Sequence, residues 1–261
     1  MDILRDTLLA LRFFTRLPLP ETDSTIDGTG GDGTGGDAQA RDLAGAARAF
    51  PLAGLVIGAL IALVWTVAAS LLPPLPAAGL AIGAGLLITG ALHEDGFSDC
   101  ADGLGGGGNR ERALEIMRDS RIGAFGAAAL IVSIGLRWTA LAQLDLVMGA
   151  AALLIAHAVS RAAIVPAMAL SRYARAQGLA STVATGTSRE TLVLTLAIAA
   201  LIALLFGGWA GLVAAAIATG CALAFLKRLE ARLGGYTGDG LGAMQQIAEI
   251  AVLLVLAGFW G

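Results

Sequence analysis

Charged residues are scarce in this chain. Only 14% of its 261 residues are charged and 57% are hydrophobic, with a mean hydropathy of +0.78, whereas soluble domains average about 25% charged residues. This composition indicates an integral membrane protein. Apolar segments run nearly end to end and leave no stretch long enough for a separate soluble domain, so residues 1–261 are expected to form a single membrane domain.

Two further shortages exclude other classes of protein. The net charge of −3 carries no basic excess that would indicate a nucleic-acid partner. The two cysteines, Cys100 and Cys221, lie far apart in the sequence, and they indicate neither a disulfide framework nor a zinc site. Both are expected to be free thiols.

The N-terminal residues 1–20, "MDILRDTLLALRFFTRLPLP", do not have the pattern of a signal peptide. Arg5, Arg12 and Arg16 interrupt any apolar core, and no small-residue cleavage site follows. We interpret this segment as an amphipathic helix on the membrane surface. Residues 21–42 are rich in Gly, Asp and Thr and lack apolar periodicity, so they are expected to form a flexible cytoplasmic loop.

Hydropathy predicts an all-α, polytopic bundle of about seven transmembrane helices. A spanning helix needs about 20 mostly apolar residues, with roughly 17 to 25 tolerated. Seven segments qualify, at approximately 51–72, 77–93, 122–142, 146–169, 191–206, 209–226 and 243–260. Of the 17 basic residues, 15 precede the first span or lie in the loops after the second, fourth and sixth spans. Because cytoplasmic loops are enriched in basic residues, the N-terminus is expected in the cytoplasm and the C-terminus outside.

Acidic residues gather in "GALHEDGFSDCADGLGGGG", residues 90–108, on the predicted cytoplasmic side. Asp95, Asp99 and Asp102 are spaced i, i+4, i+7 and share one face if the second span continues as a helix. A divalent cation would remove their repulsion, and such oxygen ligands suit Mg²⁺ or Mn²⁺, which commonly also bind substrate phosphates. The alternative is a solvated helix end whose acids only mark the membrane boundary. His93 either orients a carboxylate or ligand, or caps the interface.

Arginines follow in "GLGGGGNRERALEIMRDSRIGAFG", where Gly-rich backbone and guanidinium groups together suit an anionic substrate. Positive-inside bias explains most of them. Arg118 and Arg121, which flank Asp119 and Ser120 beside the membrane, are better explained by a binding site.

Two arginines lie inside predicted spans, where a guanidinium costs roughly 2.5–3.5 kcal/mol on insertion scales. Arg161, in the cytoplasmic half of its span, is expected to reach a phosphate or one of the aspartates. Arg137 lies deeper toward the outer side, and a structural ion pair with Asp145 is expected.

A last polar stripe enters the seventh span in "GGYTGDGLGAMQQIAEIAVLL". Asp239, Gly242, Gln246 and Glu249 recur at i, i+3, i+7, i+10. An acid one or two turns into the membrane, such as Glu249, is a functional-site hypothesis by default. Opposite the first acidic face, this stripe would complete a two-sided carboxylate site of the kind that holds one or two cations for phosphoryl transfer.

These motifs together resemble the cobalamin synthase family of adenosylcobinamide-GDP ribazoletransferases. The resemblance covers nearly the whole chain, in "FFTRLPLP", "FPLAGLVIG", "HEDGFSDCADG", "LEIMRDSRIG", "AVSR", "YARAQGL" and "GGYTGDGLGA". It implies a Mg²⁺-dependent transferase of cobalamin (vitamin B12) biosynthesis in a prokaryotic inner membrane, with its active site on the cytoplasmic side. α-Ribazole or its 5′-phosphate would attack the diphosphate of adenosylcobinamide-GDP through its ribose 3′-hydroxyl, and GMP would leave.

The resemblance also implies roles for particular residues. The expected Mg²⁺ ligands are Asp95, Asp99, Asp102 and Asp239. The residues expected to neutralise the phosphates and the leaving GMP are Arg16, Arg118, Arg121 and Arg161. Asp119 or Glu249 would orient the attacking hydroxyl. The rest of the expected substrate site comprises His93, Ser120, Thr237 and Gln246. The role of Glu94, the identity of any general base, homo-oligomerisation and assembly with other cobalamin enzymes stay open.

Two other functions fit parts of the pattern. "DCADG" matches the opening of the CDP-alcohol phosphotransferase motif, but the A-R and the later G-x-x-x-D-x-x-x-D of that motif are missing. A cation transporter also carries intramembrane acids and arginines, yet it should show broken helices in paired halves with a site near the midplane. Here the polar residues collect on the predicted cytoplasmic side.

Overall fold

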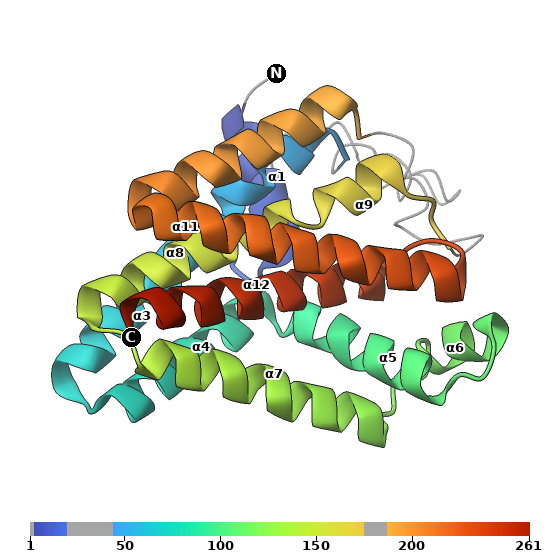
Figure 1. Cartoon of the computed structure of the whole chain (residues 1–261), viewed down its shortest axis with the longest axis horizontal. Coiled ribbons are helices and arrows are strands. Elements are labelled where there is room, and N and C mark those ends of the chain that lie inside the picture. Colours follow the sequence, from blue (N-terminus) through green and yellow to red (C-terminus); the bar gives the residue numbers. More distant parts are fainter. Residues whose placement is uncertain (1–2, 20–43, 175–186) are drawn as a thin grey trace.

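The computed structural model is a layered bundle of long helices (Figure 1). It describes residues 3–19, 44–174 and 187–261, so the predicted flexible loop at 21–42 lies outside the described residues. The elements are α1 (Ile3–Phe14), η1 (Ala46–Ala49), α3 (Phe50–Leu71), α4 (Pro74–Thr89), α5 (Leu92–Gly106), α6 (Arg110–Ile116), α7 (Ala124–Ala142), α8 (Leu146–Ala162), α9 (Val165–Leu170), α11 (Arg189–Leu233) and α12 (Gly238–Trp260). No strand occurs among these described residues, which confirms the predicted all-α class.

Five helical segments are long and apolar enough to cross a membrane, and the bent pair α4–α5 would make a sixth. The predicted spans at 51–72, 122–142, 146–169 and 243–260 correspond to α3, α7, α8 with α9, and α12. The 45-residue α11 contains two further predicted spans, 191–206 and 209–226. Non-helical Gly208 (φ 56°, ψ −137°) turns this helix back on itself, as Figure 1 shows. The bundle of apolar helices is therefore as predicted, while the count of seven spans stays a prediction.

The second predicted span, 77–93, is wrong in one respect. The chain bends by 90° between α4 and α5, because Gly90 (φ 64°) and Ala91 (φ 55°) are both left-handed. Glycine adopts this conformation freely, whereas an L-residue such as alanine does so at a cost of roughly 1–2 kcal/mol. The acidic residues therefore do not continue the second span. They lie on a new helix, α5, whose direction differs from that of α4.

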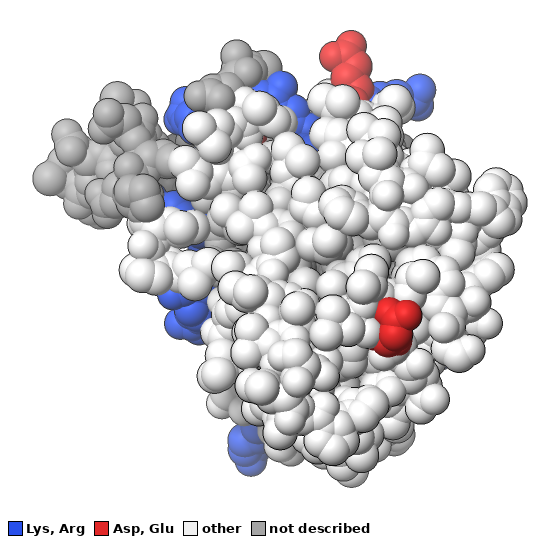
Figure 2. All heavy atoms as spheres, turned by 90° about the vertical axis from the view of Figure 1, so that its left-hand side faces the viewer, with Lys and Arg blue, Asp and Glu red and all other residues white. Residues whose placement is uncertain are grey.

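Charge divides the two ends of the bundle. The α3–α4 and α7–α8 connections, the turn of α11 at Gly208 and the C-terminus all lie at the left-hand end in Figure 1. Figure 2 views that end directly and shows a face with few charged side chains, the basic ones gathering toward its margins. The arginine-bearing segment around α6 lies at the opposite end in Figure 1. The polarity expected from the basic loops is therefore present in the folded chain.

Helices α5 and α12 meet backbone to backbone. A Cβ added to Gly96 would lie 2.9 Å from the Cα of Asp239, and one added to Gly242 would lie 3.2 Å from the carbonyl oxygen of His93. Only glycine permits so close an approach at these two positions. This contact places the acidic helix α5 against the first turn of α12, and so brings together two segments that are about 140 residues apart in sequence.

Candidate functional site

A cleft of about 670 Å³ opens between the end of α1, the α4–α5 turn, α5 and the start of α7. Its polar lining comprises Arg12, Thr15, Arg16, Thr89, Glu94, Asp95, Ser98, Asp99 and Ser120. Its apolar lining includes Phe13, Leu92, Ile122 and Leu130. The volume lies within the roughly 300–1,000 Å³ typical of small-molecule sites. Charges of both signs thus face one space.

The charged residues of the cleft lining come from different segments of the chain. Asp95 is exposed and Asp99 is half-buried, one turn apart on α5. Elsewhere in the lining, the backbone N–H of Arg16 donates to the carbonyl oxygen of Ile88 at 2.8 Å, which ties the segment after α1 to the end of α4. The Arg16 side chain crosses Gly90, where an added Cβ would come within 2.6 Å of its Nε. The left-handed turn therefore also makes room for an arginine.

The four predicted metal ligands are only partly brought together. Asp95 and Asp99 line the cleft, and the backbone of Asp239 touches α5 at Gly96. Asp102 is buried, and its two carboxylate oxygens accept from the backbone N–H groups of Gly123 at 2.7 Å and Gly126 at 2.8 Å. It thereby anchors the beginning of α7. Across the described ranges, no three His, Cys, Asp or Glu side chains converge as in a preformed metal site.

The loop before α7 presents an exposed ion pair. Arg121 donates to Asp119, with Nη2 2.7 Å from Oδ2, and this hydrogen bond lowers the pKa of Asp119 to about 2. Ser120, between them, lines the cleft. Arg118 is exposed on the same loop. Because a carboxylate with a lowered pKa is a weaker base, Asp119 is poorly suited to accept a proton.

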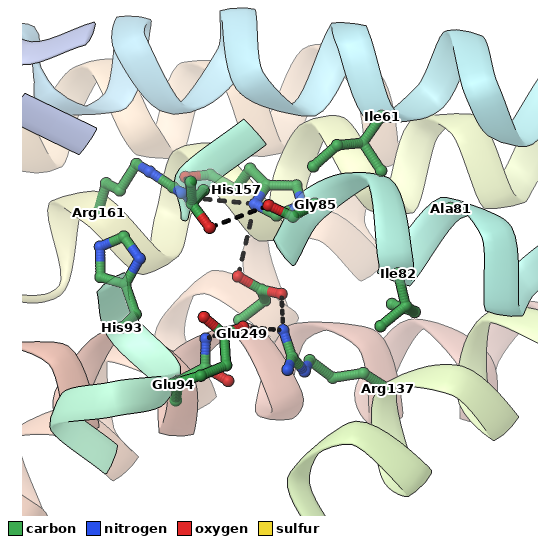
Figure 3. A pocket seen from close by; sticks show the side chains of 12 residues that line it. Ile61, Ala81, Ile82, Gly85, His93, Glu94, Arg137, His157, Arg161 and Glu249 are labelled. Carbon is green, nitrogen blue, oxygen red and sulfur yellow. Dashed lines mark hydrogen bonds and ion pairs between the residues drawn. The ribbon is translucent and has the colours of Figure 1, made fainter. Parts of the chain in front are cut away.

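Behind the cleft lies an interior cluster of charged and amide side chains (Figure 3). Arg137 Nη1 donates to Glu94 Oε1 at 3.0 Å and to Glu249 Oε1 at 2.9 Å. Gln246 donates to Glu94 at 3.1 Å and accepts from Ser133 at 3.1 Å. Each of these side chains is less than one tenth exposed. The cluster therefore joins α5, α7 and α12 inside the bundle.

Helix α8 closes the other side of this cluster. His157 Nδ1 lies 3.4 Å from Glu249 Oε2 and 3.0 Å from Arg161 Nη1. The guanidinium of Arg161 sits 5.5 Å from the centre of the Phe14 ring, and His93 stacks on the same ring at 5.6 Å. Arg161 is 1% exposed, and it contacts the Phe14 ring and donates to the backbone carbonyl oxygen of His157 at 3.1 Å.

The interior cluster surrounds a second, very small pocket. Its lining includes His93, Glu94, Arg137, His157, Arg161, Gln246 and Glu249 (Figure 3). Its volume of about 10 Å³ corresponds to about one water molecule and is far below that of a nucleotide. Glu94 and Thr89 line both spaces and separate them. Arg161, His93, Gln246 and Glu249 therefore lie behind the cleft wall and do not line the cleft itself.

Two expected roles are corrected or changed by the structure. The predicted Arg137–Asp145 pair is wrong, because Asp145 caps α8 by accepting from the N–H of Met148 at 2.7 Å while Arg137 pairs with the two glutamates. Thr237 is fully buried and caps α12, accepting from the N–H of Gly240 at 3.0 Å. Its contact in the structure is therefore with its own helix.

Sequence reasoning missed two residues of this region. Arg12 lines the cleft beside Arg16, and its signal was present in the four-residue spacing of the two arginines. Glu94 was noticed but given no role. Its partner Arg137 lies 43 residues further along the chain, and no local pattern connects them.

Comparison with known proteins gives a consistent result. The model of the cobalamin-5-phosphate synthase family matches residues 6–257. The chain is 45% identical to the adenosylcobinamide-GDP ribazoletransferase of Mesorhizobium japonicum, over 97% of this chain and 93% of that protein. Proteins with the same name from Bradyrhizobium diazoefficiens (42% identity, 99% and 95% coverage) and Ralstonia nicotianae (40%, 97% and 94%) are also similar. No solved structure matches the chain significantly.

Proposed function

The chain belongs to the cobalamin-5-phosphate synthase family, and we propose that it acts as an adenosylcobinamide-GDP ribazoletransferase whose reaction takes place in the cleft beside α5. The reaction joins adenosylcobinamide-GDP to α-ribazole or its 5′-phosphate at the end of cobalamin synthesis. The observation that carries this placement is the cleft lining, which brings Asp95 and Asp99 into one space with Arg12 and Arg16. A diphosphate and a divalent cation require both kinds of charge at one place.

The transfer replaces a phosphoanhydride bond with a phosphodiester bond. A P–O bond forms between the ribose 3′-oxygen and the phosphorus attached to cobinamide, while the bond from that phosphorus to the GMP oxygen breaks. The hydroxyl proton is lost, and the negative charge of the leaving GMP has to be stabilised. Arg12 and Arg16 are placed to bind phosphate oxygens, and Ser120 contributes a hydroxyl at the same wall. Arg118 and Arg121 add positive charge on the adjoining loop.

The residues that we propose hold Mg²⁺ are Asp95 and Asp99, with Asp239 contributed by α12. Their fit rests on oxygen chemistry and on the close contact of Asp239 with Gly96 beside the two aspartates. The same ligands would accommodate Mn²⁺. When bound, the ion would neutralise charge on the diphosphate. Asp102 acts indirectly in this proposal, since both of its oxygens already hold the start of α7.

Four of the predicted site residues are buried behind the cleft, and we propose that they support its wall. Glu249 is 3% exposed and Arg161 is 1% exposed, and neither lines the cleft. His93 and Gln246 are buried in the same way. We therefore assign these four residues to holding the cleft wall, and Thr237 to capping α12.

The charge distribution supports a proposal for the membrane placement. We propose an inner-membrane protein with the cleft on the cytoplasmic side. Arg110 and Arg112 lie in α6 and Arg118 and Arg121 follow it, at the end of the bundle that carries the acidic helix, and basic residues favour the cytoplasmic side. Helix α1 keeps Ile3, Leu4 and Phe13 exposed, which suits a helix lying in the interface.

Product formation by the purified protein tests this function. The protein in nanodiscs would be given adenosylcobinamide-GDP, α-ribazole 5′-phosphate and Mg²⁺, and corrinoid product and GMP would be followed by chromatography, with EDTA as a control. We expect equal amounts of product and GMP, both abolished by EDTA. No turnover by folded protein would contradict the proposal, and CDP-alcohol transfer and cation flux would then be measured in the same preparation.

A further inference from the structure

Arg137 connects the two helices that carry the proposed metal ligands. One guanidinium nitrogen bonds Glu94, which immediately precedes Asp95 on α5, and Glu249, which lies on the same helix as Asp239. Arg137 itself belongs to α7 and is 3% exposed. A single interior cation therefore joins both ligand-bearing helices.

The surface contact between these helices is made of glycine. Gly96 meets the backbone of Asp239, and Gly242 meets the backbone of His93. Glycine contacts allow close approach, but they supply no side chain that could form a polar or charged bond between the two helices. A small slide or rotation of α12 would move Asp239 relative to Asp95 and Asp99.

The charged cluster opposes such a movement. In the apolar interior, a displaced helix would leave Glu94, Glu249 or Arg137 without its partner, and an unpaired buried charge is strongly unfavourable. Gln246, on α12, also donates to Glu94 at 3.1 Å, and Gln245 donates to Glu249 at 2.7 Å. These hydrogen bonds form together only near one arrangement of α5, α7 and α12. Glu94 Oε2 and Arg137 Nη2 are buried without a hydrogen-bond partner.

We infer that Arg137 is a positioning residue for the proposed transferase: by bridging Glu94 and Glu249 it fixes α5 against α12 and so sets the spacing of Asp95, Asp99 and Asp239. This inference rests on the proposed function, because it takes those three aspartates as metal ligands. Arg137 lines the pocket of about 10 Å³ and does not line the cleft. It therefore acts through Glu94 and Glu249 and not by contact with substrate.

Metal binding without turnover provides the test. Mn²⁺, which gives an electron paramagnetic resonance signal when free, would be titrated into nanodisc-embedded protein. The variants are Arg137→Met, Glu94→Ala and Glu94→Gln. The last keeps an oxygen that can accept from Arg137 and Gln246. Trp65→Phe is the matched stability control, because it removes a buried hydrogen bond to Leu146 between α3 and α8, away from the cluster. Thermal unfolding and product formation are measured on every sample.

We expect Arg137→Met and Glu94→Ala each to weaken Mn²⁺ binding by about tenfold or more, as is usual when the support of metal ligands is removed. Glu94→Gln and Trp65→Phe should stay within about threefold of the parent. If Arg137→Met does not fold, the contrast between Glu94→Ala and Glu94→Gln decides the question.

Three results would overturn the inference. Mn²⁺ binding within threefold of the parent in Arg137→Met and Glu94→Ala would do so, as would equal weakening in Trp65→Phe, which would indicate a general stability effect. A parent protein that makes product but binds no Mn²⁺ would remove the metal site and this role while leaving the transferase function. A folded parent that makes no product would instead contradict the proposed function.

Discussion

The cleft and the interior cluster lie on opposite sides of Glu94 and use charge in opposite ways. In the cleft, Asp95, Asp99, Arg12 and Arg16 line one space of about 670 Å³. In the interior, Arg137, Glu94 and Glu249 are within 3.0 Å of their partners around a space of about 10 Å³. Charges that contact each other in a dry interior hold helices together, whereas charges that line an accessible space can also be reached by a ligand. Charge alone would not have distinguished the two groups.

The largest effect is expected in the cleft. Asp99→Asn keeps the side-chain shape but removes a negative charge from the proposed metal site. Charge stabilisation by a metal is worth several kcal/mol, so turnover should fall by about 10³-fold. The melting temperature should stay within about 2 °C, because the side chain is half-buried at the cleft. Glu115→Gln on α6, whose side chain is 69% exposed, is the control and should leave turnover unchanged. More than a tenth of the parent turnover in Asp99→Asn would remove Asp99 from the reaction.

The interior cluster should respond in stability. Glu249→Ala leaves Arg137 with one carboxylate partner and removes the neighbour of His157. Breaking such a buried pair costs about 3–5 kcal/mol, measurable as a lower midpoint of unfolding in detergent. Glu249→Gln, which retains hydrogen-bonding atoms, should lose less. A Glu249→Ala protein that is as stable as the parent but inactive would show that Glu249 takes part in the chemistry directly.

The helices themselves were largely predictable because hydropathy reports what a segment can bury in lipid. The spans corresponding to α3, α7, α8 and α12 were placed within a few residues. The 90° bend after α4 was not, since it depends on Ala91 adopting a left-handed conformation that its residue type disfavours. The turn of α11 fell between two predicted spans at a pair of glycines, where the sequence did carry a signal.

The site was predictable only in its local part. The spacing predicted one shared face for Asp95, Asp99 and Asp102; Asp95 and Asp99 do line one space, whereas Asp102 bonds the start of α7. The partners of Asp102 lie 21 and 24 residues away, and Arg137 reaches Glu249 across 112 residues. Such pairings depend on how helices pack, which periodicity does not encode. Arg137 was for that reason assigned to the nearer Asp145.

A smaller effect is expected from a change at Gly96, where α5 packs against α12. Gly96→Ala places a Cβ 2.9 Å from the Cα of Asp239, so α5 and α12 would have to separate. Overpacking of this kind typically costs about 1–3 kcal/mol, and Mg²⁺ dependence should shift to higher concentration. Gly83→Ala on α4 is the matched control, since nothing lies within 4 Å of the added carbon. Equal behaviour of the two variants would mean that the α5–α12 contact does not set the cleft.

The smallest effect concerns the exposed pair on the loop. Arg121 lowers the pKa of Asp119 to about 2, so the Asp119 carboxylate stays ionised at every pH above about 4. Any stability from this pair is fully present above the ordinary pKa near 3.8 and is lost only as the pH falls toward 2. Asp119→Asn should therefore leave both the melting temperature and the pH–rate profile unchanged between pH 5 and 8. An acidic limb in the parent profile that disappears in Asp119→Asn would assign Asp119 a proton-transfer role.

Metal rescue of Asp99→Cys tests most directly whether the cleft aspartates bind the reacting metal. A thiolate is a poor ligand for Mg²⁺ and a good one for softer ions such as Cd²⁺. The measurement is product formation by Asp99→Cys with each ion, alongside Asp99→Ser, which lacks the thiolate while the native Cys100 and Cys221 remain. We predict that Asp99→Cys is inactive with Mg²⁺ and recovers activity with Cd²⁺, while Asp99→Ser does not recover with Cd²⁺. Full activity of Asp99→Cys with Mg²⁺ would contradict the placement of the reaction at Asp99.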